Sequence, residues 1–482
     1  MHLRRLAYVL GAVVAAIGVG MLVAAAVAAI YGEWDDVRGI LAAAGTSVAI
    51  GVVAWRLLGE RGELTTREGF ATVGLTWFAI SFVGCLPYLF TGAIQGIENA
   101  FFETAAGFTT TGASVVPDPG ALGKGILLWR ALTQWLGGMG IIVLSVAILP
   151  LLGVGGVELA RAEAPGPQPD RLTPRFRETA KRLWLIYLGL TTAEVLFLVL
   201  GEMTFFESVA HAFTTMSTGG FGTDVGSIGA FGAYTQWVVI AFMAMAGVSF
   251  ALHFRALRNP LAYAKNSEFR IYAGILVAAS VLLVVGNWAD GAATVVRDGV
   301  FTAVSLVTTT GYATADFGGW DAALQIAIVG LFFVGGMAGS TAGGVKTYRL
   351  AVLTSAGRRD LRRLIHPRGV FVVRMGREPV PDPVVDSVQS FFLFYMLVFM
   401  TGTVALGLIE SGLGVGKDLV TSVSAVASAL GNIGPGLAEV GPASNYASIH
   451  AGGKWLLSGL MIVGRLELFP VLLLFTRELW RR

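Results

Sequence analysis

Long apolar stretches recur along the whole chain and set the first expectation about its structure. A helix needs about 20 consecutive apolar residues to cross the hydrocarbon core of a bilayer. Stretches of about this length include 6–30, 271–285 with its flanks, 391–409 and 455–475. The first stretch is far longer than the apolar part of a cleaved signal peptide, and many others follow it. The pattern therefore predicts an all-α polytopic membrane protein.

The apolar stretches follow a repeated order. Two leading transmembrane helices are expected at 6–30 and 37–59. Four longer units follow, and each has an apolar span, a short amphipathic stretch that ends in a Thr/Ser/Gly-rich tip, and a second apolar span. The expected span pairs are 70–92 with 123–152, 181–201 with 231–254, 269–288 with 320–352, and 387–411 with 453–477. We therefore expect ten full spans and four half-helices, arranged around an ion pore with pseudo-fourfold symmetry.

These units predict the domain organisation. The two leading helices occupy 1–60, and the four repeats occupy 61–165, 166–260, 261–380 and 381–482. Internal repetition has to be recognised before a fold is assigned, because otherwise the polar tips would be four unexplained loops.

The composition agrees with a membrane protein. Of the 482 residues, 55% are hydrophobic and 13% are charged, and the mean hydropathy is +0.71. Soluble globular domains have about 25% charged residues. The 64 glycines are spread through the apolar stretches, where glycine allows close approach of helices or marks unwound backbone. The single cysteine, Cys85, excludes an intrachain disulfide and is expected to be a small core residue.

The distribution of charge orients the chain. The loop 31–36 is acidic, whereas long basic loops lie on the opposite side, which the positive-inside rule makes cytoplasmic. Both termini are then cytoplasmic and all four tips are external, in a cell inner or plasma membrane. Because the basic residues are confined to one side of a membrane protein, we expect no nucleic-acid binding. The basic residues are Arg161, Arg171, Arg175, Arg177, Lys181, Arg182, Arg255, Arg258, Lys265, Arg270, Lys346, Arg349, Arg358, Arg359, Arg362, Arg363, Arg368, Arg374 and Arg377.

The four tips share a sequence design. They lie at 109–114, 215–223, 308–314 and 430–437, within FFETAAGFTTTGAS, FFESVAHAFTTMSTGGFG, GVFTAVSLVTTTGYAT and LVTSVSAVASALGNIGPG. In each, one or two helical turns lead into small, mostly hydroxyl-bearing residues and then a glycine. The tips align on Gly112, Gly219, Gly311 and Gly434.

The chemistry of the tips suits a cation without a charged ligand. An ion that leaves water needs its hydration oxygens replaced, and four strands around an axis can supply rings of backbone carbonyls and threonine hydroxyls. Glycine allows the positive φ that turns successive carbonyls toward one axis. No acidic or basic residue lies among the four positions that end at each aligned glycine. The tips therefore favour a weakly hydrated monovalent cation over a divalent cation or an anion.

At this point the chain resembles a known family. The plan of four helix–pore loop–helix units with one glycine per tip is similar to that of the Trk/Ktr/HKT superfamily of potassium transporters. The motifs QWLGGMG (134–140), STGGFG (217–222), GGMAGSTAGGVK (335–346), NIGPG (432–436) and GRLELF (464–469) resemble those of its TrkH-type membrane subunits. The resemblance covers essentially the whole chain after about residue 60.

The resemblance implies which residues bind K⁺. A serine in place of the first glycine is associated with sodium permeation in this superfamily, so glycine at all four aligned positions favours potassium. The fourth tip lacks the hydroxyl pair, so the fourfold symmetry is approximate there. The implied filter residues are Thr110, Thr111, Gly112, Ser217, Thr218, Gly219, Thr309, Thr310, Gly311, Asn432, Ile433 and Gly434.

The motif GGMAGSTAGGVK interrupts the second span of the third repeat. It nearly matches a phosphate-binding loop, but Val345 separates Gly344 from the lysine, and no strand precedes it. Close helix packing by small residues is one interpretation. The resemblance implies another, an intramembrane loop at 335–346 that obstructs ions beneath the filter, with gate residues Gly335, Gly336, Gly339, Gly343, Gly344 and Lys346.

Arg465 is the second candidate gate residue. It lies in the apolar segment MIVGRLELFPVLLLF, where a charge at the bilayer centre costs about 2.5–3.5 kcal/mol on insertion scales. Glu467 is two residues away and so faces elsewhere on a helix. One interpretation is a structural ion pair with another helix. The interpretation that we favour is a cation facing the pore just below the filter, which regulates passage together with the loop.

Other polar residues indicate anchoring and not catalysis. Glu103, Glu207 and His211 precede tips and are expected to cap or anchor half-helices. The five histidines lack metal-ligand spacing, and no nucleophile has a recognisable base, so we expect no enzyme activity and no cofactor other than K⁺ as the transported ion.

The expected function is potassium uptake by the ion-conducting subunit of a Trk-type system. The resemblance implies a homodimer in the lipid bilayer, bound to a cytosolic TrkA-like ring of nucleotide-binding regulatory subunits, with docking on the basic stretch 346–377. That stretch could also bind anionic lipid or act only as a topology signal. The alternative function is a Na⁺-permeable or cation-coupled secondary transporter (a symporter) of the same architecture.

Overall fold

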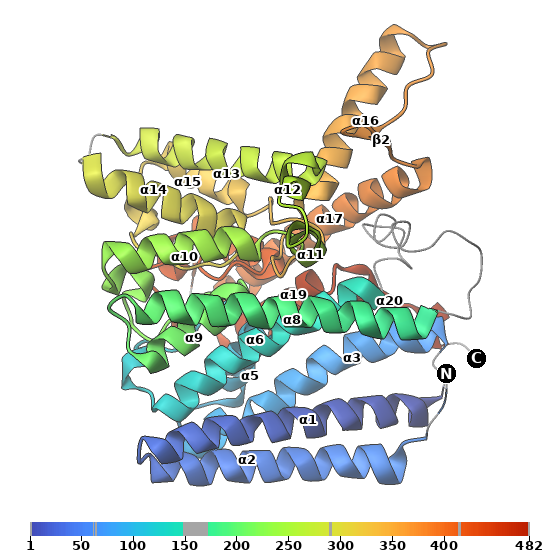
Figure 1. The fold of residues 1–482 in the computed structure, drawn as a ribbon. Helices are drawn as coiled ribbons and strands as arrows, with labels where there is room; N and C mark the ends of the chain where they lie inside the picture. The colour runs from blue at the N-terminus through green and yellow to red at the C-terminus, as the bar shows by residue number, and fades with distance from the viewer. Residues whose placement is uncertain are drawn as a thin grey trace.

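The computed structural model describes residues 2–60, 62, 65–147, 172–288, 292–412 and 416–480. It is built almost entirely of helices, most of which run in similar directions (Figure 1). The N- and C-termini lie close together at one end of the helix bundle. The end of the span expected at 123–152 and the basic residues Arg161 and Arg171 lie outside the described residues.

The two leading helices form a hairpin. Helix α1 (Leu3–Ile30) turns at Gly32, which has φ +76°, into α2 (Trp34–Val52), and α2 continues into the π-helical turn η1 (Val53–Leu58). The helices touch at glycines, because a Cβ on Gly11 would lie 2.6 Å from the carbonyl oxygen of Gly51. Small residues are what allow membrane helices to approach this closely.

Four groups of helices follow the hairpin, and each contains one short helix that ends at a tip; we call these groups the repeats. The first repeat contains α3 (Thr66–Gly84), α4 (Leu86–Thr91), α5 (Ile97–Phe108), the 3₁₀ turn η2 (Pro119–Ala121) and α6 (Lys124–Ala147). The second contains α8 (Leu172–Val199), α9 (Phe205–Met216), η4 (Ser227–Ala230), α10 (Ala233–Ala246) and α11 (Phe250–Ala256).

The third and fourth repeats have the same order. The third contains α12 (Leu261–Lys265), α13 (Ser267–Gly286), α14 (Ala292–Val307), η6 (Phe317–Gly319), α15 (Ala322–Leu331), α16 (Thr347–Ile365) and the antiparallel pair β1 (Arg374–Met375) and β2 (Glu378–Pro379). The fourth contains α17 (Asp382–Gly412), α18 (Leu419–Gly431), η7 (Ala438–Val440), η8 (Tyr446–Ser448), α19 (Ala451–Arg465), α20 (Phe469–Leu474) and α21 (Arg477–Trp480).

The second arms of the later repeats are broken, and this corrects the expected spans. Helices α10 and α11 meet at 100°, α15 and α16 are separated by the non-helical segment 332–346, and α19 and α20 are separated at 466–468. Only the break in the third repeat was expected from the sequence. Among the described residues, six helices have the length and composition to cross a membrane, or seven if α10–α11 is one span. The ten full spans therefore remain a prediction.

The four half-helices α5, α9, α14 and α18 are held by local caps where the sequence supplies them. Thr204 and Glu207 form a reciprocal capping box on α9, and the Asp418 carboxylate accepts the backbone N–H of Thr421 at the start of α18. Such caps pair donors at a helix N-terminus that otherwise have no intrahelical partner. The role expected of Glu207 as a cap is therefore confirmed.

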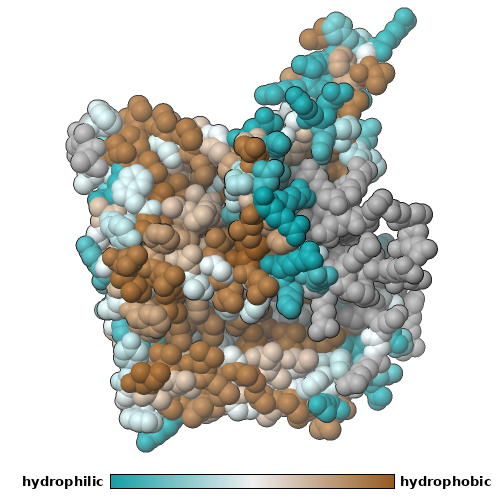
Figure 2. Space-filling view, viewed as in Figure 1, coloured by the Kyte–Doolittle hydropathy of each residue, from teal (hydrophilic) through white to brown (hydrophobic). Residues whose placement is uncertain are grey.

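The surface matches a protein surrounded by lipid. In Figure 2, hydrophobic residues cover much of the visible face of the bundle, and hydrophilic residues gather at the edges and around α16. Helix α16 extends away from the bundle at the end where both termini lie (Figure 1). Large exposed apolar side chains include Val19, Leu196, Val277, Leu397 and Val404. On a soluble protein so much exposed apolar surface would be an aggregation hazard.

Candidate ion-conduction site

The four half-helices end in the same unusual backbone turn. One residue just after each helix has a left-handed conformation although it is not glycine: Thr110, Thr218, Thr309 and Asn432 have φ between 53° and 57°. Two residues later a glycine also has positive φ, with values of 78° at Gly112, 77° at Gly220, 80° at Gly311 and 113° at Gly434. A left-handed conformation costs a non-glycine residue about 1–2 kcal/mol, so four such residues in matching places mark a built site.

The turns also share one hydrogen-bond pattern, which aligns the four tips residue by residue. The backbone N–H groups of Thr111, Gly219 and Thr310 each donate to a carbonyl five residues earlier at 2.8 Å, and that of Ile433 does so at 3.0 Å. Gly219 therefore corresponds to Thr111, and Gly220 corresponds to Gly112.

This alignment corrects the second tip. When the four tips are aligned by sequence, Gly219 corresponds to Gly112. In the structure, however, the glycine of the second tip with positive φ is Gly220, one residue later. The motif STGGFG contains two successive glycines, Gly219 and Gly220, and the sequence pattern alone does not distinguish them. Gly219 keeps a place in the site as the counterpart of Thr111. We call Gly112, Gly220, Gly311 and Gly434 the ring glycines.

The ring glycines close the four tips into a ring. A Cβ added to Gly112 would lie 2.0 Å from the carbonyl oxygen of Gly219, and one added to Gly220 would lie 1.9 Å from that of Thr310. A Cβ on Gly311 would lie 1.8 Å from the carbonyl oxygen of Ile433. The circle is completed by Gly434, whose added Cβ would lie 2.7 Å from the carbonyl oxygen of Thr111.

Each ring glycine thus lies directly against a carbonyl of the next repeat. We call the carbonyls of Thr111, Gly219, Thr310 and Ile433 the ring carbonyls. The C-terminal ends of four helices meet at this ring, and a helix C-terminus carries a partial negative charge that favours a cation. All eight of these residues come from backbone that has left the helix, which at membrane depth requires a buried or water-lined setting.

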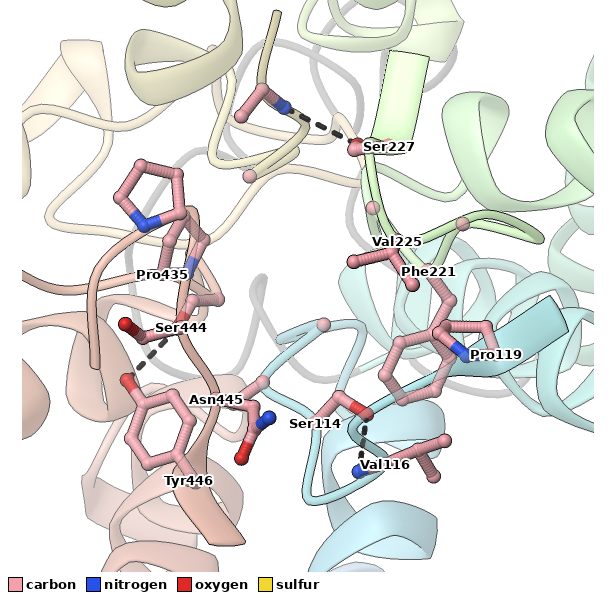
Figure 3. Close-up of a pocket in the computed structure, with 18 of the residues that line it drawn as sticks. Ser114, Val116, Pro119, Phe221, Val225, Ser227, Pro435, Ser444, Asn445 and Tyr446 are labelled. Atoms are coloured by element: carbon pink, nitrogen blue, oxygen red, sulfur yellow. Dashed lines mark hydrogen bonds between the residues drawn. The ribbon is translucent and has the colours of Figure 1, made fainter. Parts of the chain in front are cut away.

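A pocket opens on one side of the ring. Its wall includes the ring glycines and the residues that follow them, and Figure 3 shows segments of all four repeats around it. Ser114, Phe221, Pro435 and Tyr446 are among the side chains that line it. The hydroxyl of Tyr446 donates to the carbonyl oxygen of Gly434 at 2.9 Å, which fixes the backbone at the wall.

The intramembrane loop at 335–346 lies on the other side of the ring. Its backbone N–H groups at Gly343 and Gly344 donate to the Thr309 hydroxyl at 2.6 Å and to the carbonyl oxygen of Gly431 at 2.9 Å. The Thr341 hydroxyl donates to the carbonyl oxygen of Met216 at 3.1 Å. Along the chain, Met216, Thr309 and Gly431 come before the ring glycines of their tips, whereas the residues that line the pocket include many that come after the ring glycines. The ring therefore lies between the pocket and the loop.

The glycines of the loop have distinct structural roles. Gly335, Gly339 and Gly344 have φ of 81°, 79° and 71°. Gly343 is required by close approach, because an added Cβ would lie 2.3 Å from the carbonyl oxygen of Gly431, and one on Gly336 would lie 2.8 Å from that of Gly247. Lys346 has φ 72° and its ammonium group donates to the carbonyl oxygen of Ala342 in the same loop. The loop is thus an ordered non-helical segment.

Arg465 binds the loop through backbone carbonyls and not through an acid. Its side chain is buried, and its guanidinium donates to the carbonyl oxygen of Thr341 at 2.6 Å and to that of Gly137 in α6 at 3.2 Å. Glu467 instead pairs with Arg349 at 2.5 Å. The alternative of a structural ion pair for Arg465 is therefore wrong among the described residues. The guanidinium joins α19, the loop and α6 below the ring.

Buried polar side chains hold the tips in place, and one of them, Arg130, was not expected from the sequence. Glu103 and Arg130 form a buried ion pair at 2.7 Å, and Glu103 also accepts from the Ser114 hydroxyl and the Val115 N–H at 2.9 Å each. Arg130 donates to the carbonyl oxygen of Gly222 at 3.2 Å. The anchoring role expected of Glu103 is confirmed, but its arginine partner on α6 had no local signal. His211 contacts the Tyr312 hydroxyl at 3.2 Å and so joins the second and third tips.

The fold and the site together define a class of protein: a multi-pass membrane protein in which four helical repeats surround a ring of backbone carbonyls suited to cations. The chain belongs to the TrkH family of cation transport proteins, whose sequence model matches residues 39–270 and 275–481. The resemblance drawn from the motifs is therefore confirmed.

Individual relatives are similar over their full length. The Trk system potassium uptake protein TrkH of Salmonella typhimurium is 39% identical over 491 residues, and its counterpart in Escherichia coli K12 is 38% identical, with complete coverage of both chains in each case. The crystal structure of the potassium transporter TrkH from Vibrio parahaemolyticus has 36% identity and a TM-score of 0.91, again over the whole of both chains. The all-α membrane fold expected from the sequence is thereby confirmed.

Proposed function

We propose that this protein takes up potassium across the cell membrane as the ion-conducting subunit of a Trk-type system. The closed ring of carbonyls from Thr111, Gly219, Thr310 and Ile433 is the observation that carries the proposal. Rings of carbonyls without formal charge replace the hydration shell of a monovalent cation. The full-length relatives are named as potassium uptake proteins, which supports K⁺ as the cation.

In this proposal the tips form the selectivity filter. The ligands are backbone oxygens around the ring glycines. They belong to the filter residues expected from the sequence, with Gly220 added: Thr110, Thr111, Gly112, Ser217, Thr218, Gly219, Thr309, Thr310, Gly311, Asn432, Ile433 and Gly434. The side chains differ between tips, from threonine to asparagine and isoleucine, while the backbone turn is the same. Backbone oxygens are therefore the better candidates for ion ligands.

The intramembrane loop and Arg465 form the gate. The loop lies against the ends of three half-helices, and the guanidinium of Arg465 adds a positive charge beside the loop at Thr341. A cation that has passed the ring meets this charge and the loop backbone. Displacement of the loop would remove both obstacles together.

The orientation and partners complete the proposal. The tips face outward and both termini face the cytoplasm, where the positive-inside rule places the basic stretch 346–377. That stretch includes α16, which extends away from the bundle (Figure 1). We propose a homodimer that binds a cytosolic TrkA-like nucleotide-binding ring at this stretch.

Flux measurement in proteoliposomes tests the proposal. Rb⁺ uptake is measured at a clamped membrane voltage, without any other ion gradient, in vesicles with the protein and in empty vesicles. The pore predicts passive Rb⁺ flux that follows the voltage and that substitutions at the ring glycines change. A strict requirement for a H⁺ or Na⁺ gradient would overturn the pore and favour the cation-coupled secondary transporter, and equal Na⁺ and Rb⁺ flux would favour the Na⁺-permeable alternative.

A further inference from the structure

The second tip differs from the other three at the residue that carries the ring carbonyl. Thr111, Thr310 and Ile433 are all β-branched, and a β-branched side chain stiffens the residue that carries it. Thr111 and Thr310 are held further, because their hydroxyls contact those of Thr109 at 2.7 Å and Thr308 at 2.8 Å. Gly219 has no side chain, although it follows Thr218 and precedes Gly220 in the same turn. Its carbonyl therefore lacks a local restraint.

A side chain from another repeat fills the place that Gly219 leaves empty. A Cβ added to Gly219 would lie 2.3 Å from the carboxamide carbon of Gln134, and the three nearest atoms all belong to that carboxamide. Gly219 does not have a positive φ, so its backbone would accept a side chain. The volume that a threonine side chain occupies in the first and third tips is thus occupied here by Gln134.

The carboxamide of Gln134 binds the backbone on both sides of Gly220. Its Nε2 donates to the carbonyl oxygen of Gly219 at 2.7 Å, and its Oε1 accepts from the N–H of Phe221 at 3.1 Å. The side chain is fully buried. Because Gln134 uses both its donor and its acceptor, the carboxamide fixes the direction of the Gly219 carbonyl.

Gln134 lies on helix α6, and this helix is packed closely against the first and second tips. A Cβ on Gly137 would lie 1.9 Å from the carbonyl oxygen of Phe108, at the end of the first half-helix. A Cβ on Gly138 would lie 2.9 Å from the Cα of Ser217. Trp135 stacks on Phe213 of the second half-helix with 4.9 Å between ring centroids. Helix α6 therefore lies wedged between the first and second tips.

We propose that Gln134 is the positioning residue for the second tip. Its side chain, from the first repeat, takes the place of the side chain that Gly219 lacks, and in this way determines the preference for K⁺ over Na⁺. The inference rests on the proposed potassium pore. A ring selects K⁺ through the number and placement of its carbonyl dipoles. A Gly219 carbonyl without its restraint can move toward a smaller ion, so the ring loses selectivity before it loses conduction.

A double-mutant cycle tests the replacement directly. The variants are Gln134→Ala, Gly219→Thr and the double variant, together with Gln134→Leu, which keeps most of the volume but no polar group. Rb⁺ and Na⁺ uptake are measured in proteoliposomes that contain equal amounts of monodisperse protein. The matched control is Gln236→Ala, because Gln236 is also buried and donates to a loop carbonyl, that of Phe231 at 2.8 Å, which is not a ring carbonyl.

The proposal predicts a definite pattern. Gln134→Ala and Gln134→Leu lower the Rb⁺:Na⁺ uptake ratio by about threefold to tenfold, the size expected for one lost hydrogen bond to the ring. Gly219→Thr alone also lowers the ratio, because its side chain collides with Gln134. The double variant regains at least half of the loss on a logarithmic scale, because the threonine enters the vacated volume. Gln236→Ala keeps the wild-type ratio.

Two results would overturn the positioning role. One is an unchanged ratio in both folded Gln134 variants, and the other is a double variant no better than the worse of its parents. If Gln134→Ala fails to fold, the comparison of Gln134→Leu with Gln236→Ala still decides the question. Failure of the pore itself is seen separately, as absence of voltage-driven Rb⁺ uptake by the wild-type protein.

Discussion

At the scale of single residues, the ring depends on four glycines for two independent reasons. Their φ values of 77–113° disfavour a side chain, and the carbonyl of the next repeat occupies the space where a Cβ would lie. The same backbone turn places threonine or asparagine in the left-handed region two residues earlier. Strain of this kind persists only where the surrounding packing enforces it. The tips are therefore rigid through their contacts with one another.

Serine substitutions test the ring glycines. Gly112→Ser and Gly311→Ser are expected to raise Na⁺ relative to Rb⁺ uptake by about tenfold, because strain of about 1–2 kcal/mol and the collision with a carbonyl both move the ring. Gly220→Ser is expected to have the same effect, as its place in the ring requires.

The control for this series is Gly319→Ser. Gly319 lies in the segment that follows the third tip, and an added Cβ there meets no atom within 4 Å. Its uptake ratio should equal that of the wild type, measured in the same proteoliposomes. Unchanged ratios in Gly112→Ser and Gly311→Ser would mean that these are not filter positions.

At the scale of elements, the second helical span is interrupted in the second, third and fourth repeats, next to the ion-conduction site. The segment 332–346 between α15 and α16 reaches the ends of three half-helices, and the break between α10 and α11 receives it: the Met337 N–H donates to the carbonyl oxygen of Gly247 at 2.9 Å. The break between α19 and α20 places Arg465 and Glu467 on different partners. Broken helices at membrane depth are tolerated because neighbouring protein satisfies their backbone groups.

Arg465→Ala is expected to increase basal Rb⁺ flux by about tenfold or more. The guanidinium holds the carbonyl oxygen of Thr341, and a hydrogen bond from a charged group contributes about 1.5–3 kcal/mol. Its loss releases the loop and removes a positive charge near the ion path. Arg38→Ala is the control, since Arg38 is exposed and pairs with Asp35 at 3.4 Å in the leading hairpin. If Arg465→Ala folds like the wild type but has a lower Rb⁺ flux, Arg465 has a purely structural role instead.

At the scale of the whole molecule, contacts between repeats hold the ring together. The side chain of Asn432 in the fourth repeat donates to the Thr111 hydroxyl at 3.0 Å, and Lys454 donates to Asn99 at 2.7 Å. Arg130 joins Glu103 of the first tip to the backbone of the second. With the His211–Tyr312 contact between the second and third repeats and the Gly344 N–H to Gly431 hydrogen bond between the third and fourth, each repeat is linked to its neighbours around the ring.

Glu103→Gln tests whether the Glu103–Arg130 ion pair stabilises the protein by linking the first two tips. Removing one partner of a buried ion pair costs about 3–5 kcal/mol, because the other charge stays buried. We expect a clearly lower melting temperature in detergent and a lower Rb⁺:Na⁺ uptake ratio. Glu202→Gln is the control, because Glu202 is exposed and accepts the Gly232 N–H at 2.9 Å. Wild-type stability in Glu103→Gln would contradict a linking role for the pair.

The membrane fold, the four tips and the interruption of the third repeat could be predicted from the sequence alone. Each of these depends on local features: runs of apolar residues set the spans, and Gly and Thr clusters indicate where a helix ends. The leading hairpin at 6–30 and 37–59 and the half-helix that ends before Gly112 were predictable for the same reason. Such features act within a few residues, so they can be read without knowledge of distant neighbours.

The way in which the four tips meet could not be predicted from the sequence and is seen in the three-dimensional structure. The structure showed that Gly220 and not Gly219 has the positive φ, and that the helix breaks at 466–468, a site without glycine. It also identified the partners of Arg465 and placed Gln134 on the second tip, 85 positions before the carbonyl that it binds. These outcomes depend on packing between repeats, where a carbonyl or a carboxamide from one segment occupies space left by another, and no local pattern specifies that partner.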